Sequence, residues 1–402
     1  MDSKRAIKLR AWWWSRQGLD GSLWSTSIER VLASTGWMRS VGGCGPYLGL
    51  HARCGASRAA VDAAIANLQI HELPSARGCT YVLPACDFAL GLAAGRAFAA
   101  ADMAAARKLG VTDAEIDRLG DKVLEALVSG PLDPDAIKAA VGPAVRNLGP
   151  EGRKKGIITT LPLALGRLQA EGDIRRIPTN GRLDQQRYRY APWRPNPLGK
   201  SPWNAADIHK ELARRFFEWT GAARLAEFQA FAGIGVKAAK EAAAALGLPP
   251  LDDDGPELTT KALSEEWKSF AAPREPQYAL LSSLDGLILL RRNLRSLLAE
   301  EDLERKMAED DGCSTGGTLT DMPNNAIVDR GRVVGIWDYD QEAAAVVWAS
   351  YVKPNAALKT AVADMETFVR EQLGDARCFS LDSPKSRQPR LQGIRAIAKG
   401  TS

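Results

Sequence analysis

The chain has 402 residues, of which 45% are hydrophobic and 25% are charged, and its net charge is +5. These values are typical of a folded globular protein with two to four domains; they exclude a disordered chain and a general polycation. Six cysteines without a CxxC pair argue against a secreted disulfide scaffold, and no uncharged apolar run approaches the roughly 18 residues of a membrane span. The N-terminus lacks the apolar run of a signal peptide. We therefore expect a cytoplasmic, monomeric protein that does not enter a membrane.

The first unit, residues 1–108, is predicted to contain three helices and then a hairpin. Helical patterns cover residues 6–17, 27–35 and 57–69, and strand-like runs cover residues 72–73 and 80–83. Ser27 and Ser57 are suited to be N-caps. Three helices followed by a hairpin outline a winged helix.

Three adjacent tryptophans, Trp12, Trp13 and Trp14, lie on the first of these helices. We expect two of them to be buried and one to be half-exposed, because three neighbours on a helix point in different directions. The alternative is a stacking platform for a nucleobase.

The same order of elements returns twice. Residues 109–198 carry helices that begin at Thr112, Asp133 and Thr159 or Thr160, and then a hairpin over 174–178 and 186–191 with the turn signal Asn180-Gly181. Residues 199–272 carry three more helices and a weak strand candidate at 256–260. The sequence thus predicts three tandem winged-helix units.

Residues 273–402 are predicted to form a β-rich, barrel-like C-terminal domain, which makes the fold class α+β. We expect the acidic stretch Glu300–Asp321 to be a loop or insertion and residues 357–375 to be an amphipathic helix. The basic segment 386–397 is expected to be a strand or a tail.

Positive charge is concentrated in residues 150–215, where 14 Lys and Arg face six acids. This local excess is larger than that of the whole chain, so a polyanion would bind there, and the candidate DNA-binding residues are Lys154, Lys155, Arg167, Arg175, Arg176, Arg182, Arg187 and Arg189. Five hairpin arginines on five phosphates predict that the logarithm of affinity falls with log salt at a slope of about −4.5. Their replacement by Ala should then abolish binding with little loss of stability. The alternative is a solvated hairpin face.

Catalytic motifs are scarce in this chain. A zinc site is not expected from Cys44, His51, Cys54, Cys79 and Cys86, because these residues lack the close pairing of structural zinc ligands. No local signature supports a Cys/His nucleophile pair, and we expect buried cysteines. Without a phosphate loop, a GxGxxG or an HExxH motif, no cofactor is expected. Glycines 42, 43 and 45 favour a tight turn, although they also suit the close approach of a ligand or another backbone.

The order of units, together with ARGCTYVLPA, GIITTLPLALGRLQAEGDI and SLDGLILLRR, resembles the AlkZ/YcaQ-like winged-helix family. That family includes bacterial DNA glycosylases that unhook interstrand crosslinks and remove bulky alkylated bases. Its active members carry a Gln-x-Gln or Gln-x-Asp motif that positions the attacking water. The matching place here is Gly43-Cys44-Gly45, which lacks both side chains. Tyr81 stands where many relatives have histidine, and Asp285 matches the tail aspartate of the family.

The resemblance implies double-stranded DNA, intact or damaged, as the partner. One hypothesis is a DNA-binding member of the family without glycosylase activity. The second is a glycosylase with a substituted site that uses Glu72, Asp87 or Asp285. A third is a protein or small-molecule interaction module that has kept the fold.

Overall fold

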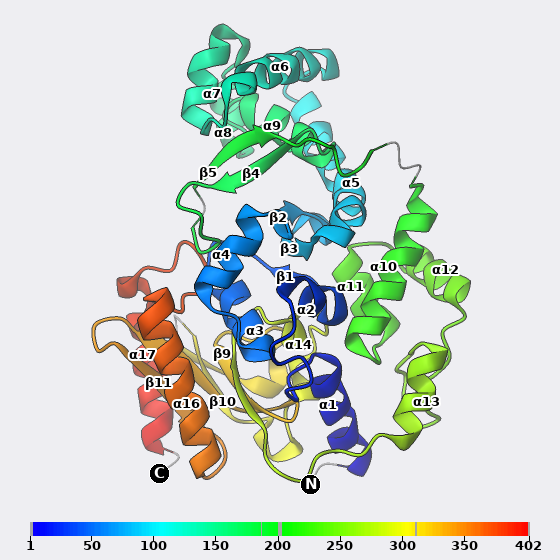
Figure 1. Ribbon diagram of the computed structural model, residues 1–402, viewed down its shortest axis with the longest axis vertical. Coiled ribbons are helices and arrows are strands. Elements are labelled where there is room, and N and C mark those ends of the chain that lie inside the picture. The colour runs from blue at the N-terminus through cyan, green and yellow to red at the C-terminus, as the bar shows by residue number, and fades with distance from the viewer. Residues whose placement is uncertain (1–2, 186, 200–202, 310–311, 401–402) are drawn as a thin grey trace.

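The computed structural model describes residues 3–185, 187–199, 203–309 and 312–400. Helices and antiparallel sheets alternate along the chain, which confirms the predicted α+β class. In Figure 1 the second unit forms an upper lobe, the first unit lies in the middle, and the C-terminal sheet lies below with α16 (Ala356–Phe368) and α17 (Pro384–Gly400). The helices of the third unit pack along the right side of this view.

The first unit has the predicted helices and hairpin. Its elements are α1 (Lys4–Arg16), α2 (Ile28–Thr35), β1 (Met38–Arg39), α3 (Gly45–Cys54), α4 (Arg58–Ala66), β2 (Ile70–Pro74) and β3 (Thr80–Pro84). Ser27 and Ser57 accept backbone N–H groups as the predicted N-caps. A short strand, β1, joins the hairpin, so that the sheet has the order β1-β3-β2 with Arg39 opposite Tyr81.

All three tryptophans of α1 are buried, so the prediction of one half-exposed ring was wrong. Helix α1 is covered on several sides by segments that are remote in sequence. Trp12 packs edge-on against Trp267, Trp13 stacks on the guanidinium of Arg291 at 3.7 Å, and Trp14 donates to Gln277. None of these rings is free to stack on a base.

The second unit follows the long helix α5 (Phe88–Arg107). It comprises α6 (Asp113–Ala126), α7 (Pro134–Val141), α8 (Gly149–Lys154), α9 (Leu161–Ala170), β4 (Ile174–Pro178) and β5 (Tyr188–Pro192) around its own hydrophobic core. Thr112 and Asp133 are the expected N-caps, whereas Thr160 precedes α9 without a side-chain cap. By length and composition alone, Ala85–Arg107 is long and apolar enough to cross a membrane. In this fold its side chains Leu90 and Leu92 pack in the core.

The third unit is helical in the described residues. It consists of α10 (Ala205–Thr220), α11 (Leu225–Ala232), α12 (Val236–Leu246) and α13 (Lys261–Ser269). The strand candidate at 256–260 forms only isolated bridges from Leu258 to Ala223 and Pro250.

The C-terminal domain contains an open four-stranded sheet with the order β11-β10-β9-β6, so the described residues do not form the barrel that we expected. Its strands and short helices are β6 (Tyr278–Leu281), β9 (Asn325–Asp329), β10 (Arg332–Asp340), β11 (Ala345–Ser350), α14 (Gly286–Leu289) and α15 (Leu294–Leu297). The acidic stretch contains a hairpin of β7 (Lys306–Glu309) and β8 (Gly312–Thr315) instead of only a loop.

The basic C-terminal segment is a helix, α17, and not a strand or tail. Its Arg387 is buried and bonds to Asp338 and Asp375, and Arg390 bonds to Asp338 as well. Acids from the sheet and from the preceding loop thus neutralise the positive charge of this helix, a partnership that the local sequence does not reveal.

The loop between β4 and β5 ties three units together. Leu183 is buried, and its N–H donates to the hydroxyl of Tyr47 in the first unit at 2.9 Å. Arg182 donates to the carbonyl oxygen of Leu373 at 3.1 Å, and Arg377 donates to that of Asp184. The hairpin is therefore an internal connection as well as part of the surface.

Candidate nucleic-acid interface

A narrow hollow lies where the first unit, the third unit and the C-terminal domain meet; we call it the arginine pocket. It is lined by Trp37, Arg39, Arg77, Tyr81, Phe231, Leu284, Gly286, Leu289, Leu290 and Arg292. Its volume is about 10 Å³, which is roughly what one water molecule needs. Cations interleaved with aromatic rings are a common surface for nucleic acids.

Arg39 enters the pocket from β1, which pairs with β3. Its Nη1 donates to the carbonyl oxygen of Thr80 at 2.8 Å, and its guanidinium lies over the ring of Tyr81, 5.6 Å from the centroid. The rest of its hydrogen-bonding capacity has no acidic partner, since no carboxylate in the described chain lies within 4.0 Å of Arg39.

Arg77 is held in an unusual backbone conformation at the tip of the β2–β3 hairpin. Its φ of 56° and ψ of 24° lie in the left-handed helical region, which is unfavourable for residues other than Gly, Asn and Asp. Neighbours on two sides hold this turn. Gly233, at the end of α11, packs so closely that an added Cβ would lie 2.9 Å from the Cα of Arg77, and a Cβ on Gly78 would lie 3.1 Å from Phe98. Strain of this kind persists where the surroundings enforce it and is frequent at functional sites.

Arg292 is also left-handed, with φ 48°. It follows α14 and forms two hydrogen bonds with the exposed carboxylate of Asp321, at 3.0 and 2.6 Å. Two of the three arginines of the pocket therefore have a strained backbone, and one of the three has an ion pair.

Tyr81 forms the floor between these arginines. Its side chain is 3% exposed, and in the part of the chain that the structure describes its hydroxyl has no hydrogen-bond partner. Burial raises the pKa of Tyr81 to about 12, against the opposing effect of the three guanidinium groups. The hydroxyl is therefore a neutral donor at physiological pH. None of the described lining residues has a carboxylate or carboxamide.

The position matched to the family motif is packed and closed. Cys44 is buried, and its thiol donates to the carbonyl oxygen of Asp375 at 3.0 Å, while burial raises its pKa. A Cβ on Gly43 would lie 2.0 Å from the carbonyl oxygen of Cys378. Gly45 faces Ser282. Gly43 thus admits another stretch of backbone, which was the alternative to the tight turn that we favoured, whereas Gly42 has the positive φ of 73° that a turn requires.

The described residues contain no cluster of His, Cys, Asp and Glu able to hold a metal ion. His51 stacks on Phe368 with ring centroids 3.7 Å apart. His71 is buried without a partner for either ring nitrogen among the described residues, and burial lowers its pKa to about 3. Neither histidine has a described bond to a cysteine thiol.

The three carboxylates predicted for a substituted site have internal partners. Asp285 caps α14 and accepts two hydrogen bonds from buried Arg53, at 2.7 and 2.9 Å. Asp87 is fully buried; it accepts from Trp37 and forms an ion pair with Arg215 at 2.8 Å.

Glu72 is the third of these carboxylates. It is buried, it accepts from Ser40, and burial raises its pKa. Its second oxygen has no close hydrogen-bond partner among the described residues, although the hydroxyl of Tyr188 is near enough to oppose the effect of burial on the pKa of Glu72.

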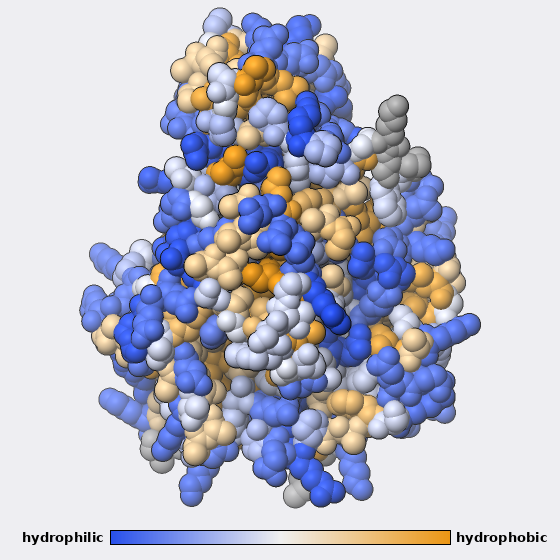
Figure 2. Space-filling model, in the orientation of Figure 1, coloured by the Kyte–Doolittle hydropathy of each residue, from blue (hydrophilic) through white to orange (hydrophobic). Residues whose placement is uncertain are grey.

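The predicted DNA-binding residues fall into two groups. Lys154, Lys155, Arg187 and Arg189 are exposed. The other four are half-buried. Arg167 lies beside Asp113 and Asp117, and burial lowers the pKa of Arg175. Arg176 forms a hydrogen bond with Gln169, and Arg182 forms an ion pair with Asp184. Hydrophilic residues cover most of the face shown in Figure 2, with smaller hydrophobic areas among them.

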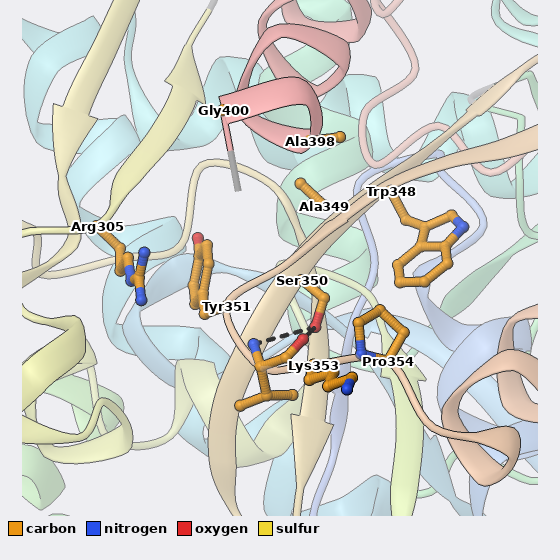
Figure 3. Close-up of a pocket in the computed structure, with 10 residues that line it drawn as sticks. Arg305, Trp348, Ala349, Ser350, Tyr351, Lys353, Pro354, Ala398 and Gly400 are labelled. Carbon is orange, nitrogen blue, oxygen red and sulfur yellow. Dashed lines mark hydrogen bonds between the residues drawn. The ribbon is translucent and has the colours of Figure 1, made fainter. Parts of the chain in front are cut away.

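A larger hollow, of about 710 Å³, lies between β11 and the end of α17 (Figure 3). Trp348, Tyr351 and Arg305 line it, and the hydroxyl of Ser350 is bonded to the backbone of Val352. None of the residues predicted to bind DNA or to catalyse a reaction lines this hollow.

Sequence reasoning did not single out Arg39, Arg77 or Arg292. Two of them lay inside segments that carried the resemblance, ARGCTYVLPA and SLDGLILLRR. The sequence signal that could have indicated them is that each of these two segments contains an arginine beside a turn or a helix end. Their meeting in one pocket required the fold.

A DNA glycosylase AlkZ-like family model matches residues 44–368, and the chain therefore belongs to the AlkZ-like DNA glycosylase family. The fold is similar to that of the Streptomyces sahachiroi DNA glycosylase AlkZ, with a TM-score of 0.67 and 18% sequence identity. That similarity covers 94% of this chain and 99% of the other. No curated protein matches the chain.

Proposed function

We propose that this protein binds double-stranded DNA, including damaged or distorted duplex, without the glycosylase activity of its family. The observation that carries the proposal is the arginine pocket, which has three arginines, of which only Arg292 has an ion pair, and aromatic walls but no carboxylate or carboxamide among its described lining residues. Such a site attracts the DNA backbone, whereas hydrolysis of a glycosidic bond needs a group that orients water and stabilises a cationic sugar.

The surroundings of the pocket support the same conclusion. Glycine at positions 43 and 45 offers no side chain, and Asp87 and Asp285 are held by cationic partners. A hollow that holds about one water molecule also has no room for an extruded base. We further propose that the helix and hairpin units act as winged helices, with Arg187, Arg189, Lys154 and Lys155 on the phosphates of the same duplex.

Family membership and Glu72 favour a second candidate, a glycosylase with a substituted site. Glu72 is a buried carboxylate with a raised pKa, a feature that general acids and bases share, and the hydroxyl of Tyr188 lies near it. In such an enzyme, Glu72→Gln would abolish base release and leave DNA binding intact.

A single series of experiments separates these candidates. Gel shifts on undamaged, alkylated and crosslinked duplexes at two salt concentrations measure binding, and alkaline cleavage at abasic products measures base release. We expect salt-sensitive binding without strand cleavage, and an affinity loss of roughly 100-fold in the double variant Arg39→Gln, Arg77→Asn. Cleavage that Glu72→Gln removes would establish the second candidate, and the absence of duplex binding at low salt would refute both.

A further inference from the structure

We infer that the arginine pocket is a phosphate site, in which Arg39, Arg77 and Tyr81 hold one oxygen of a DNA backbone phosphate. The inference rests on the proposed DNA binding and makes it specific. It assigns this pocket to the sugar-phosphate backbone and not to a base.

Charge is the first reason. In the described chain, neither Arg39 nor Arg77 has a carboxylate within 4.0 Å, although most buried or half-buried arginines of this fold have acidic partners. Both guanidinium groups are close enough to Tyr81 to affect its pKa, and so is Arg292. Asp321 forms an ion pair with Arg292 and also interacts electrostatically with Arg77, so one carboxylate acts on two of these three cations. An anion between Arg39 and Arg77 would further reduce the repulsion between the guanidinium groups.

The hydroxyl of Tyr81 is the second reason. Tyr81 is 3% exposed, and its hydroxyl has no hydrogen-bond partner among the described residues, although buried tyrosines usually have one. The hydroxyl oxygen itself is not fully buried, so a ligand can reach it. The group is neutral at physiological pH and can donate to an oxyanion without adding negative charge. A hydrogen bond to a charged acceptor is stronger than one to a neutral acceptor.

Size and rigidity are the third reason. The hollow of about 10 Å³ admits a single oxygen atom, as a phosphate can present, but not a planar base. The turn of Arg77 is fixed by Gly233 and Phe98 before any ligand arrives. Such preorganisation lowers the entropic cost of binding.

The first test uses inorganic phosphate with the full chain, so it does not depend on duplex binding. Broadening of the ³¹P resonance is compared in the wild type, Tyr81→Phe and Arg77→Asn, with Arg118→Gln, at an exposed position of α6 that has no proposed phosphate contact, as the exposed-cation control. Asparagine tolerates left-handed backbone, so Arg77→Asn removes the charge without adding strain. We expect broadening that falls in Tyr81→Phe and Arg77→Asn but persists in Arg118→Gln. Equal broadening in all four folded proteins would overturn the inference.

The second test places the phosphate in DNA. Single linkages of a bound duplex are replaced in turn by neutral methylphosphonates, and affinities are measured for the wild type and Arg77→Asn. We expect one linkage whose neutralisation weakens wild-type binding about tenfold and has little further effect in Arg77→Asn.

The two tests distinguish a failure of the phosphate site from a failure of the proposed function. Duplex binding without any linkage that depends on Arg77 refutes the phosphate site and leaves the proposed function standing. Phosphate binding by the pocket without duplex binding refutes the proposed function and leaves the site.

Discussion

The arginine pocket and the β4–β5 hairpin are both rich in arginine, but the fold uses their charges in opposite ways. On the hairpin, Arg182 is bound to Asp184 and to the backbone of Leu373. In the pocket, Arg39 and Arg77 both act on the pKa of Tyr81, and no carboxylate of the described chain lies within 4.0 Å of either guanidinium group. A local count of cations therefore locates positive charge but does not tell which cations remain available to a ligand.

The largest expected effect concerns the buried Arg53–Asp285 ion pair at the start of α14, the helix that lines one side of the arginine pocket. Asp285→Asn leaves Arg53 buried with an incomplete set of partners, and we expect the free energy of unfolding to fall by about 3–5 kcal/mol in urea denaturation. The double variant Arg53→Leu, Asp285→Leu should lose less than the two single variants together. Full stability of Asp285→Asn with loss of DNA binding would instead give this carboxylate a direct role in the site.

The second prediction concerns His71 on β2, which lies near Arg175 and Arg176 of the β4–β5 hairpin. His71 is buried in its neutral form, and its folded-state pKa of about 3 lies below the usual value near 6.5. Below pH 6.5 the unfolded chain binds a proton that the folded chain does not, so stability is lost as pH falls toward 3. Between pH 7 and pH 5 we expect a loss of about 2 kcal/mol that is absent in His71→Leu. Parallel pH profiles of the two proteins would contradict the assignment.

The third prediction compares two arginines of one loop. Arg182→Gln should lower the free energy of unfolding by about 1–3 kcal/mol and leave duplex affinity unchanged, because its hydrogen bonds are internal. Arg187→Gln, at an exposed position, should leave stability unchanged and weaken binding. If both variants lose only affinity, the original prediction for the hairpin arginines stands in full.

The smallest effect is in the salt dependence of duplex binding. Removing one phosphate contact should reduce the slope of log affinity against log salt by about 0.9. We expect that change for Arg77→Asn and none for Arg182→Gln, measured by fluorescence anisotropy over a salt series. The opposite pattern would place the phosphate contact on the hairpin.

The sequence by itself determined most local structure. Ser27, Ser57, Thr112 and Asp133 cap helices as predicted, because a cap depends on residues within one turn. The hairpins of the first two units also follow from turn residues and neighbouring strands. The segments that led to the family resemblance were likewise readable without coordinates.

Only the tertiary structure decided which groups are partners. It buried Trp12 to Trp14 on several sides, neutralised Arg387 with acids of the sheet and preceding loop, and brought Arg39, Arg77 and Arg292 together from three segments. Burial and ion pairing depend on residues far apart in the chain, and periodicity and composition contain no information on which distant residues meet.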